Sequence, residues 1–520
     1  MTPITDGSRL PPSKRITRRE LLRTTLISSA GIGLAACAGE NTPEEATATP
    51  EVSATVEAAP HIFVGEPKRA RNAIVIVLDS LRADHVGCYG NDWIRTPTLD
   101  SLAKESIVFT RAYPESLPTI PMRRALHTGM RAWPFRDWVR RTAANNVWAG
   151  WAPIEDDVLT LAEILVKQGF QTGFVTDTYH YFAPGMNFHR GFKQFLWVRG
   201  QEADAYRSIL PISSDEVEAV FNPNVPEELE GMKYFTAFVI ASHLANQAGR
   251  SKEEDYPAPR VFREAMDWLD ENKKAERFFL LVDAFDPHEP WDPPQKYIDL
   301  YDAGYEGKVI TAPIYGVSSY LSEGELNHMR ARYAAEVTLV DKWLGRFLDR
   351  ARDLGMLDDT LVVVTSDHGH QLGEHGIVGK LPIGLWYELV DVPLLLTLPN
   401  REGAGSRVEA FAQHQDIVPT LLRYLGVDAT VPLPGLDLVG LWEGHVEPRE
   451  RISCGMNDYS LCRDERYAYM VRHDGTNPKL YDMTADPLQQ HDLADEERGA
   501  VNEMHSKLLA DAGGELPGWV

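Results

Sequence analysis

The chain has 520 residues, 43% of them hydrophobic and 25% charged, which is the ordinary composition of a globular protein with a substantial core. This length allows one large α/β domain with a smaller one, or two or three ordinary domains. The formal net charge of −24 leaves no basic excess to neutralise phosphates, which argues against nonspecific binding of nucleic acid.

Residues 1–37 are typical of an export signal. Basic residues precede an apolar stretch, 24–36, that is too short to span a membrane as a stable anchor. Residues 17–22 resemble a twin-arginine signal, and Cys37 ends the apolar stretch as the lipidated cysteine of a lipobox does. An ordinary secretory signal with a chance cysteine is the alternative. We expect an exported lipoprotein, anchored through Cys37 at the outer face of the cytoplasmic membrane, or a periplasmic protein.

Residues 38–66 are rich in Ala, Thr, Glu and Pro and lack apolar periodicity, so they predict a flexible tether. The remaining cysteines after Cys37 are Cys88, Cys454 and Cys462. Cys454 and Cys462 could pair outside the cytoplasm, but these thiols do not make a disulfide framework.

Residues 67–446 predict a catalytic domain with a mainly parallel sheet flanked by helices, because short apolar runs alternate with helix-period segments. The runs 73–78, 278–282 and 361–365 are continuously apolar, as strands buried on both faces are. Residues 260–272 and 330–354 space their apolar side chains at helical period.

Polar residues follow each of these apolar runs. Asp79 ends the first run, Asp286 and His288 follow the second, and Asp367 and His368 follow the third. One aspartate after a strand is usually a cap or a turn residue. Ligands of open parallel sheets, however, bind beyond the carboxyl ends of the strands. The repeated pattern therefore predicts a functional site at one edge of the sheet.

The last part of the chain has a different pattern. In residues 447–520, short mixed segments such as 467–471 and 479–481 are separated by Gly and Pro. They predict a small antiparallel sheet with a closing helix, packed on the main domain. Residues 200–256 are acidic and less patterned, and we expect an insertion near the rim of the site.

Motifs rich in Asp, His and Gly occur in a fixed order between about residue 72 and residue 495. They are DSLRADHVGCYG at 79–90, TIPMRRALHTG at 119–129, DPHEPWDPP at 286–294, TSDHG at 365–369 with GEHG and GK up to 380, DIVPTLL at 416–422 and LYDMTADP at 480–487. Together they resemble the sulfatase family of the alkaline phosphatase superfamily. The resemblance implies an alkaline-phosphatase-like fold, hydrolysis of sulfate esters on small molecules or glycans, and one divalent metal ion, Ca²⁺ by family default.

Asp79, Asp367 and His368 supply carboxylates and an imidazole, which suit one divalent cation. In the family segment, Thr119 would complete this set, because a divalent ion acidifies a hydroxyl that it binds. The simpler alternative is that the two aspartates only cap strand ends.

Four further side chains have roles implied by the resemblance. Arg123 would hold the charged oxygens of the transferred group and support the nucleophile. Lys380 and His375 would bind the same oxygens from the opposite side. His288 would protonate the leaving oxygen, since histidine titrates near neutral pH. Taken singly, His375 could be a loop hydrogen-bonding residue and Lys380 a surface charge.

Thr119 stands where sulfatases keep a cysteine or serine, in the pattern C/S-x-P-S-R-x-x-x-x-T-G, which they oxidise to formylglycine. Ser116 begins a competing match, but that register puts Ile120 at the arginine position and changes the ten-residue distance from the nucleophile to Gly129. Thr119 therefore takes the nucleophile position, and threonine cannot be oxidised to formylglycine.

Other departures from the family pattern bear on the metal and the substrate. Ser80 replaces a second aspartate beside Asp79, and His368 is a nitrogen ligand, which favours Mn²⁺ or Zn²⁺ over Ca²⁺. The family's lysine-containing G-K-W-H-type segment is replaced by residues 175–180, so we expect Asp177 to repel an anion there.

Formylglycine has two hydroxyls and expels sulfate by breaking a carbon–oxygen bond, whereas threonine has one. A phosphorylated threonine can be hydrolysed by direct attack at phosphorus. The leading hypothesis is therefore a metal-dependent hydrolase of sulfate esters or similar monoanionic phosphoesters. A phosphodiesterase or phosphonate monoester hydrolase is the second. The third is a non-catalytic binder of sulfated or phosphorylated glycans at the cell surface, which the retained site residues argue against.

Overall fold

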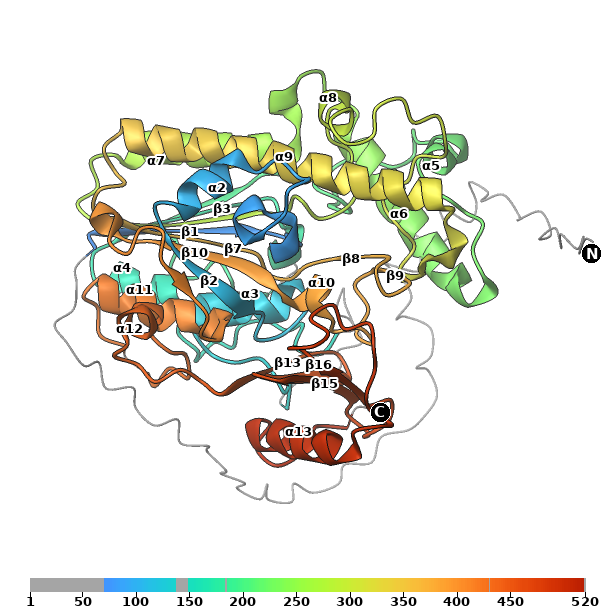
Figure 1. The fold of residues 1–520 in the computed structure, drawn as a ribbon. Coiled ribbons are helices and arrows are strands. Elements are labelled where there is room, and N and C mark those ends of the chain that lie inside the picture. Colours follow the sequence, from blue (N-terminus) through green and yellow to red (C-terminus); the bar gives the residue numbers. More distant parts are fainter. Residues whose placement is uncertain (1–69, 137–147, 183–184, 430, 519–520) are drawn as a thin grey trace, which may run out of the picture.

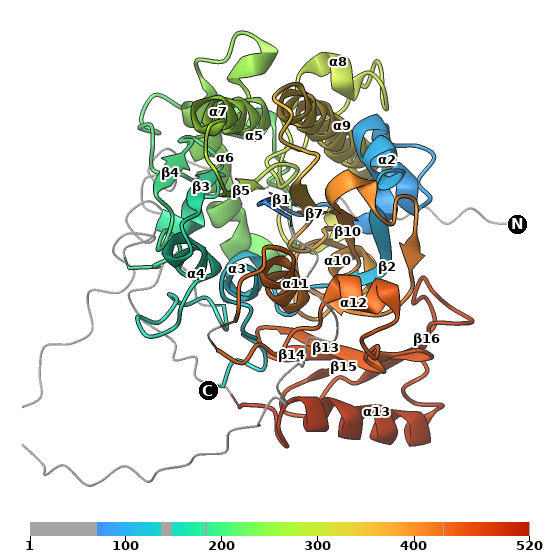
Figure 2. The same cartoon turned by 90° about the vertical axis from the view of Figure 1, so that its left-hand side faces the viewer.

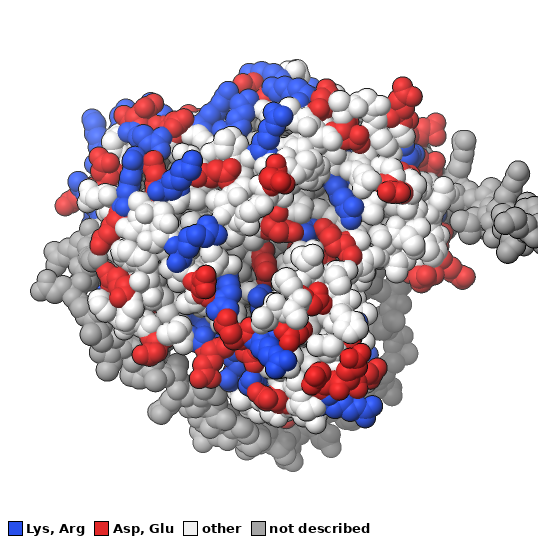
Figure 3. Space-filling model, in the orientation of Figure 1, with Lys and Arg blue, Asp and Glu red and all other residues white. Residues whose placement is uncertain are grey.

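The computed structural model describes residues 70–136, 148–182, 185–429 and 431–518. The predicted export signal, its lipid-bearing Cys37 and the tether at 38–66 lie outside these residues. No helix in the described part of the chain combines the length and the apolar character needed to cross a membrane. Acidic and basic side chains are interspersed on the face shown in Figure 3.

A nine-stranded sheet forms the centre of the described chain, in the order β11-β2-β10-β7-β1-β5-β3-β4, with β12 also paired to β2. Strand β10 is antiparallel to β2 and β7, and the other pairs are parallel. The strands are β1 Asn72–Leu78, β2 Ile107–Tyr113, β3 Gln171–Thr176, β4 Gln194–Trp197, β5 Phe278–Ala284, β7 Thr360–Thr365, β10 Val392–Thr397, β11 Arg407–Val408 and β12 Ala412–Gln413.

The predicted apolar runs are the three central strands β7, β1 and β5, which lie side by side. In β1, Ile74 and Ile76 pack into one hydrophobic cluster, whereas Val75 and Val77 pack into another on the opposite face. Alternate side chains of a strand point to opposite faces, so a strand covered on both faces must be apolar throughout. The prediction of a mainly parallel sheet is confirmed.

Helices cover both faces of this sheet (Figures 1 and 2). One face carries α2 Pro97–Ala103, α7 Pro257–Asn272 and α9 Glu323–Asp353, and the other carries α3 Thr119–Thr128, α4 Leu161–Lys167, α11 Ile417–Tyr424 and α12 Leu438–Glu443. Both predicted helices are confirmed as parts of α7 and α9. Helix α9 starts before residue 330 because the Ser322 hydroxyl accepts a hydrogen bond from the Glu325 amide at 3.3 Å and caps the helix.

Smaller elements lie beside the main layers. They are α5 Ser214–Ala219, α6 Glu230–Gln247, α8 Gln295–Ile298, α10 Tyr387–Val390 and a three-stranded sheet of β6 Gly316–Val317, β9 Ile377–Gly379 and β8 Gln371–Leu372. The less patterned region 200–256 therefore contains the long helix α6, which the sequence did not predict.

The C-terminal part forms an antiparallel sheet, β13 Arg451–Met456, β14 Tyr459–Asp464, β15 Tyr467–Arg472 and β16 Lys479–Asp482, closed by α13 Arg498–Asp511 (Figure 1). This confirms the predicted smaller subdomain. Cys454 and Cys462 are both free thiols. Cys462 pairs with Ser453 across β13 and β14, so Cys454 points to the opposite face of the sheet and packs in a different cluster. A disulfide between them would require a change of register.

Candidate active site

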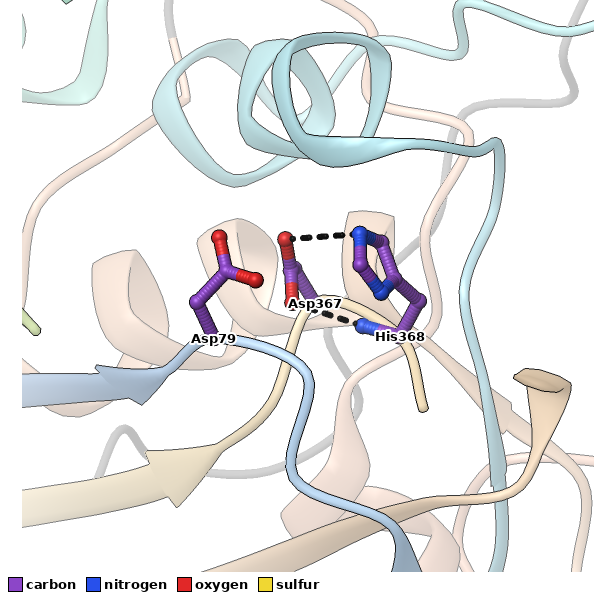
Figure 4. A group of neighbouring side chains, drawn as sticks. All are labelled: Asp79, Asp367 and His368. Carbon is purple, nitrogen blue, oxygen red and sulfur yellow. Dashed lines mark hydrogen bonds and ion pairs between the residues drawn. The ribbon is translucent and has the colours of Figure 1, made fainter. Parts of the chain in front are cut away.

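Asp79, Asp367 and His368 meet at the carboxyl ends of β1 and β7 (Figure 4). Each offers one ligand atom, and these atoms all lie within 4.8 Å of one another. Strands β1 and β7 are parallel neighbours, so the residues that follow them emerge at the same edge of the sheet. The predicted grouping of these three side chains is therefore present, and all three are buried.

Hydrogen bonds outside this group orient its members. The Ser80 hydroxyl donates to Asp79 Oδ1 at 2.8 Å, and the Ser80 amide donates to Asp367 Oδ1 at 2.9 Å. His368 Nδ1 lies 2.9 Å from the carbonyl oxygen of Gly369, to which it donates its proton. That bond leaves Nε2 with its lone pair free to bind a cation. Ser80 stands where the family pattern has a second aspartate, and it positions the carboxylates of Asp79 and Asp367.

Arg123 lies beneath this group and does not line the pocket described below. Its guanidinium donates to Asp79 Oδ2 at 2.9 Å, to Asp367 Oδ2, and to the Thr119 carbonyl at 3.3 Å. Two further bonds, of 2.8 and 2.7 Å, go to Asp283 on β5. The sequence analysis did not single out Asp283, although a charged residue within a buried apolar strand was a usable signal.

The electrostatics of this cluster suit a divalent cation. Asp79, Asp283 and Asp367 face the single guanidinium of Arg123, so the buried group carries excess negative charge. Burial and the neighbouring Asp367 raise the pKa of Asp79 well above its usual value. Burial also lowers the pKa of His368 to about 4, so its imidazole is neutral. A divalent ion held by Asp79, Asp367 and His368 would offset the excess charge, and this donor set fits one.

Thr119 is the first residue of α3, and its Oγ1 lies 3.5 Å from Nε2 of His368. Helix α3 ends at Thr128 and is capped by Gly129, whose φ of +73° is the left-handed conformation that favours glycine. The distance between Thr119 and Gly129 in the motif is therefore the length of this helix, which explains why the alternative register at Ser116 fails.

Thr119 lies at a cavity of about 390 Å³. The residues that line it are Pro118, Thr119, Trp148, Trp151, Tyr179, His180, Glu202, Met232, Phe235, Thr236, Val239, His288, Glu289, Ala312, Pro313, Tyr315, Lys380 and Met456. The predicted residues Thr119, His288 and Lys380 are thus brought together. Helix α6 forms part of the wall, which places the region 200–256 at the site, as expected.

Lys380 and His288 are in direct contact. The Lys380 ammonium donates to Nε2 of His288, and Nδ1 of His288 donates to the Glu289 carbonyl at 2.6 Å. Burial, with Lys380 adding to it, lowers the pKa of His288 well below its usual value. The near-neutral titration expected for His288 therefore does not hold, and its imidazole is neutral beside a cation.

Glu289 is a further residue of this cluster that the sequence analysis did not assign. Its carboxylate accepts a hydrogen bond from the Tyr315 hydroxyl and lies 3.0 Å from Nε2 of His370. It also lies 3.9 Å from the Lys380 ammonium. Glu289 therefore fixes the position of Lys380 at the cavity.

His375 is not brought to the cavity. Its Nδ1 lies 2.7 Å from Glu388 Oε1, its Nε2 lies 2.9 Å from the carbonyl of Gln489, and its ring stacks on Trp386 at 4.2 Å. Burial disfavours the charged form of His375, but the hydrogen bond and the negative charge of Glu388 outweigh the effect of burial. The pKa of His375 is therefore raised. Both nitrogens are engaged, and the side chain joins its loop to the C-terminal subdomain.

Residues 175–180 contribute differently from the expectation. Asp177 is buried away from the cavity, where it accepts a hydrogen bond from the Phe285 amide at 2.8 Å, so it does not face a bound anion. Tyr179 and His180 line the cavity instead. The Tyr179 hydroxyl donates to Glu202 at 2.7 Å, and Glu202 lies 4.0 Å from Nε2 of His180. Only tertiary structure brings Glu202 to this place.

The sulfatase family model matches residues 71–427, which is more than half of the chain. The chain belongs to the sulfatase family. The match contains Asp79, Thr119, Asp367, His368 and Lys380, whereas Met456 of the cavity wall lies beyond it.

The proteins similar to this chain include hydrolases named for different ester classes. The multifunctional alkaline phosphatase superfamily protein PehA of Trinickia caryophylli is 26% identical, and the match covers 82% of this chain and 91% of that protein. An arylsulfatase of Clostridium perfringens is 23% identical over 86% and 95% of the two chains. The crystal structure of the phosphonate monoester hydrolase of Agrobacterium radiobacter has a TM-score of 0.66 at 21% identity, covering 85% of this chain and 95% of that one. This likeness confirms the fold.

Proposed function

We propose that this chain is a metal-dependent hydrolase of sulfate esters or of chemically similar monoanionic phosphoesters, and that Thr119 is its nucleophile. The observation that carries the proposal is the position of Thr119, which lines the cavity together with Lys380 and His288. Its Oγ1 also lies 3.5 Å from Nε2 of His368 in the Asp79–Asp367–His368 group. A hydroxyl, a cation-binding group and a proton donor then face one reacting centre.

In the first step, Thr119 Oγ1 releases its proton to solvent and forms a bond to sulfur or phosphorus, and the bond from that atom to the leaving oxygen breaks. The leaving oxygen takes a proton from the Lys380–His288 pair. In the second step, water attacks sulfur or phosphorus and the bond to Oγ1 breaks. One proton of the water goes to Thr119 Oγ1, and the other restores the proton of the Lys380–His288 pair. Bound at Asp79, Asp367 and His368, a divalent ion would supply positive charge for the transferred oxygens and for the threonine hydroxyl.

Arg123 contributes as a positioning residue. Its bonds to Asp79 and Asp367 fix the two carboxylates, and its bond to the Thr119 carbonyl fixes the start of α3. Because Thr119 is the first residue of α3, the unpaired amides of the first helical turn lie beside it and favour negative charge there.

The second candidate is a phosphodiesterase or phosphonate monoester hydrolase. It is favoured by Thr119 itself, since a sulfated threonine cannot be released by the carbon–oxygen cleavage that formylglycine permits. The names of the similar proteins include both an arylsulfatase and a phosphonate monoester hydrolase, so the fold accommodates both ester classes.

The deciding experiment compares p-nitrophenyl sulfate with bis-p-nitrophenyl phosphate, using protein loaded in turn with Ca²⁺, Mn²⁺ or Zn²⁺. Turnover of either ester that disappears in Thr119→Ala supports the proposal, and the preferred ester separates the two candidates. Turnover that persists without Thr119 would refute the mechanism. Binding of sulfated or phosphorylated glycans with no turnover of either ester would favour the non-catalytic alternative.

We also propose, from the sequence alone, that the protein is exported and held at the membrane by a lipid on Cys37. Detergent partitioning of the full chain should place it in the detergent phase, and Cys37→Ala should move it to the aqueous phase. An unchanged distribution in the variant would refute the anchor.

A further inference from the structure

Beyond the reacting group, much of the cavity wall is apolar. The apolar residues of this wall are Pro118, Trp148, Trp151, Met232, Phe235, Val239, Ala312, Pro313 and Met456. An apolar wall is common in ligand sites. An apolar wall alone therefore does not specify a substrate, and the charged residues around it have to be considered as well.

Helix α6 supplies one continuous part of this wall. Met232, Phe235 and Val239 are spaced by three and four residues, so they lie on the same face of the helix. Phe235 is 52% exposed. A large ring left open at the mouth of the cavity is available to cover an apolar part of the substrate.

Positive charge is scarce in the cavity. Lys380 is the only lysine or arginine among the described residues that line it, and its ammonium is already shared between His288 and Glu289. Burial, with a contribution from Arg123, lowers the pKa of His180 to about 3, so this histidine adds no charge near neutral pH.

Glu202 supplies negative charge instead, once the pH exceeds its pKa of about 7. Glu202 lines the wall at 8% exposure. Its carboxylate accepts a hydrogen bond from the Tyr179 hydroxyl at 2.7 Å and lies 4.0 Å from Nε2 of His180. Neither partner is a permanent cation. An anionic group on the leaving side of the ester would therefore meet Glu202 with only Lys380 as a nearby cation, and Lys380 is already shared with His288 and Glu289. Such an approach has a substantial cost in a partly dehydrated site.

We propose that this half of the cavity selects esters whose leaving group is apolar and carries no negative charge, and that Phe235 and Glu202 set the preference. The inference rests on the proposed function, because it assigns the substrate class of the same site. Aryl and alkyl esters fit this description. Polyanionic glycans, whose sugar rings carry several sulfates or carboxylates, do not.

Binding and turnover are tested separately, with the metal-loaded full chain. Thr119→Ala protein is titrated calorimetrically with 4-ethylphenyl sulfate and with 4-carboxyphenyl sulfate, and with the matching phenyl methyl phosphodiesters. We expect the ethyl member of each pair to bind at least roughly tenfold more tightly. Glu202→Gln in the same background should bring the two affinities closer by raising that of the carboxylate.

Phe235→Ala should weaken binding of the 4-ethylphenyl ester by roughly tenfold and leave methyl sulfate unchanged. Leu488→Ala is the matched control, because Leu488 is 53% exposed and lies outside the cavity lining. Circular dichroism and the melting temperature of each variant show whether it is folded. Phe235→Leu, which keeps an apolar side chain, should retain part of the preference if the Ala variant unfolds.

Equal affinity for the two members of each pair, tighter binding of a sulfated glycan disaccharide, or no binding of any ester would overturn the inference. Turnover by the wild-type protein separates this result from the proposed function. Turnover without leaving-group preference refutes only the inference, whereas selective binding to a protein that never turns over refutes only the proposed chemistry.

Discussion

At the scale of single residues, the proposed mechanism depends on the side chain of Thr119. Thr119→Ala should reduce kcat by roughly 10³-fold or more, because the covalent step is lost. Thr119→Ser should keep substantial activity, since it retains one hydroxyl at the same place. Mass spectrometry of the wild-type protein quenched during turnover should find the transferred group on the peptide that contains Thr119. An adduct on another residue would contradict the assignment.

The pH dependence of substrate binding should reflect Glu202. Burial and the neighbouring Glu289 raise the pKa of Glu202 to about 7, against the opposing effects of Tyr179 and Lys380. The carboxyl is therefore neutral below this pH and negative above it, where it repels an anionic ester. KM should rise as the pH passes upward through about 7, and Glu202→Gln should remove that rise. His180, neutral in this range, does not mask the effect. A KM profile that is unchanged in the variant would contradict this assignment.

Asp283 should be important for stability because it holds the buried guanidinium of Arg123. Asp283→Ala removes one member of a fully buried ion-pair network, and such losses cost about 3–5 kcal/mol. Urea unfolding would measure the change. Asp270→Ala is the control, since Asp270 pairs with Arg350 at the surface, where a pair contributes about 0–1 kcal/mol. Similar losses in both variants would argue against a special role for the buried network.

At the scale of secondary-structure elements, the sequence predicted what depends on local pattern. The runs in β1, β5 and β7 were recognisable because each is apolar throughout, and their ends identified Asp79, Asp367 and His368. Helix α6 was missed because apolar residues occur all around it: Val239 faces the cavity, whereas Ala237 and Ile240 pack in a separate cluster.

The site also contains residues that could not be predicted from the sequence, because only tertiary contacts bring them to the cavity. Glu202 and Glu289 come from loops, and no spacing in the chain indicates that both face Lys380. His375 illustrates the opposite error, because its place within a family-like segment suggested a substrate contact, whereas Glu388 and Gln489 hold it elsewhere.

Helix α3 should be sensitive at its C-terminal cap. The backbone of Gly129 has a φ of +73°, which other residues rarely adopt. A Cβ added there would lie 2.9 Å from the Leu433 side chain and 3.1 Å from that of Val418. Gly355 has a similar φ of +67° with open space around it. Gly355→Ala should therefore cost about 1 kcal/mol from backbone strain alone. Gly129→Ala should cost more and should also lower kcat, because Thr119 begins the same helix. Equal effects on stability and activity would contradict this view.

At the scale of the whole molecule, the catalytic domain and the C-terminal subdomain meet beside the site. Met456 of β13 lines the cavity, and the Gln489 carbonyl accepts a hydrogen bond from His375. The Trp386 indole donates to the Tyr481 hydroxyl at 3.0 Å, which adds a second link. The C-terminal sheet therefore completes one wall of the cavity as well as covering the domain.

Metal binding should link the site to the stability of the entire fold. Because Asp79, Asp283 and Asp367 outnumber Arg123 in a buried cluster, a bound divalent ion offsets repulsion that otherwise disfavours the folded state. At a free concentration about 1,000 times the Kd, such an ion adds about 4 kcal/mol to the free energy of unfolding. Dialysis against EDTA should therefore lower the Tm as well as abolish turnover, and adding back Ca²⁺, Mn²⁺ or Zn²⁺ one at a time should identify the ion by the largest recovery. His368→Ala, which removes a ligand while keeping all three carboxylates, should lose most of this response. A Tm that is insensitive to chelation in the wild-type protein would argue against a stabilising metal ion. A response that is unchanged in His368→Ala would place the metal at another site.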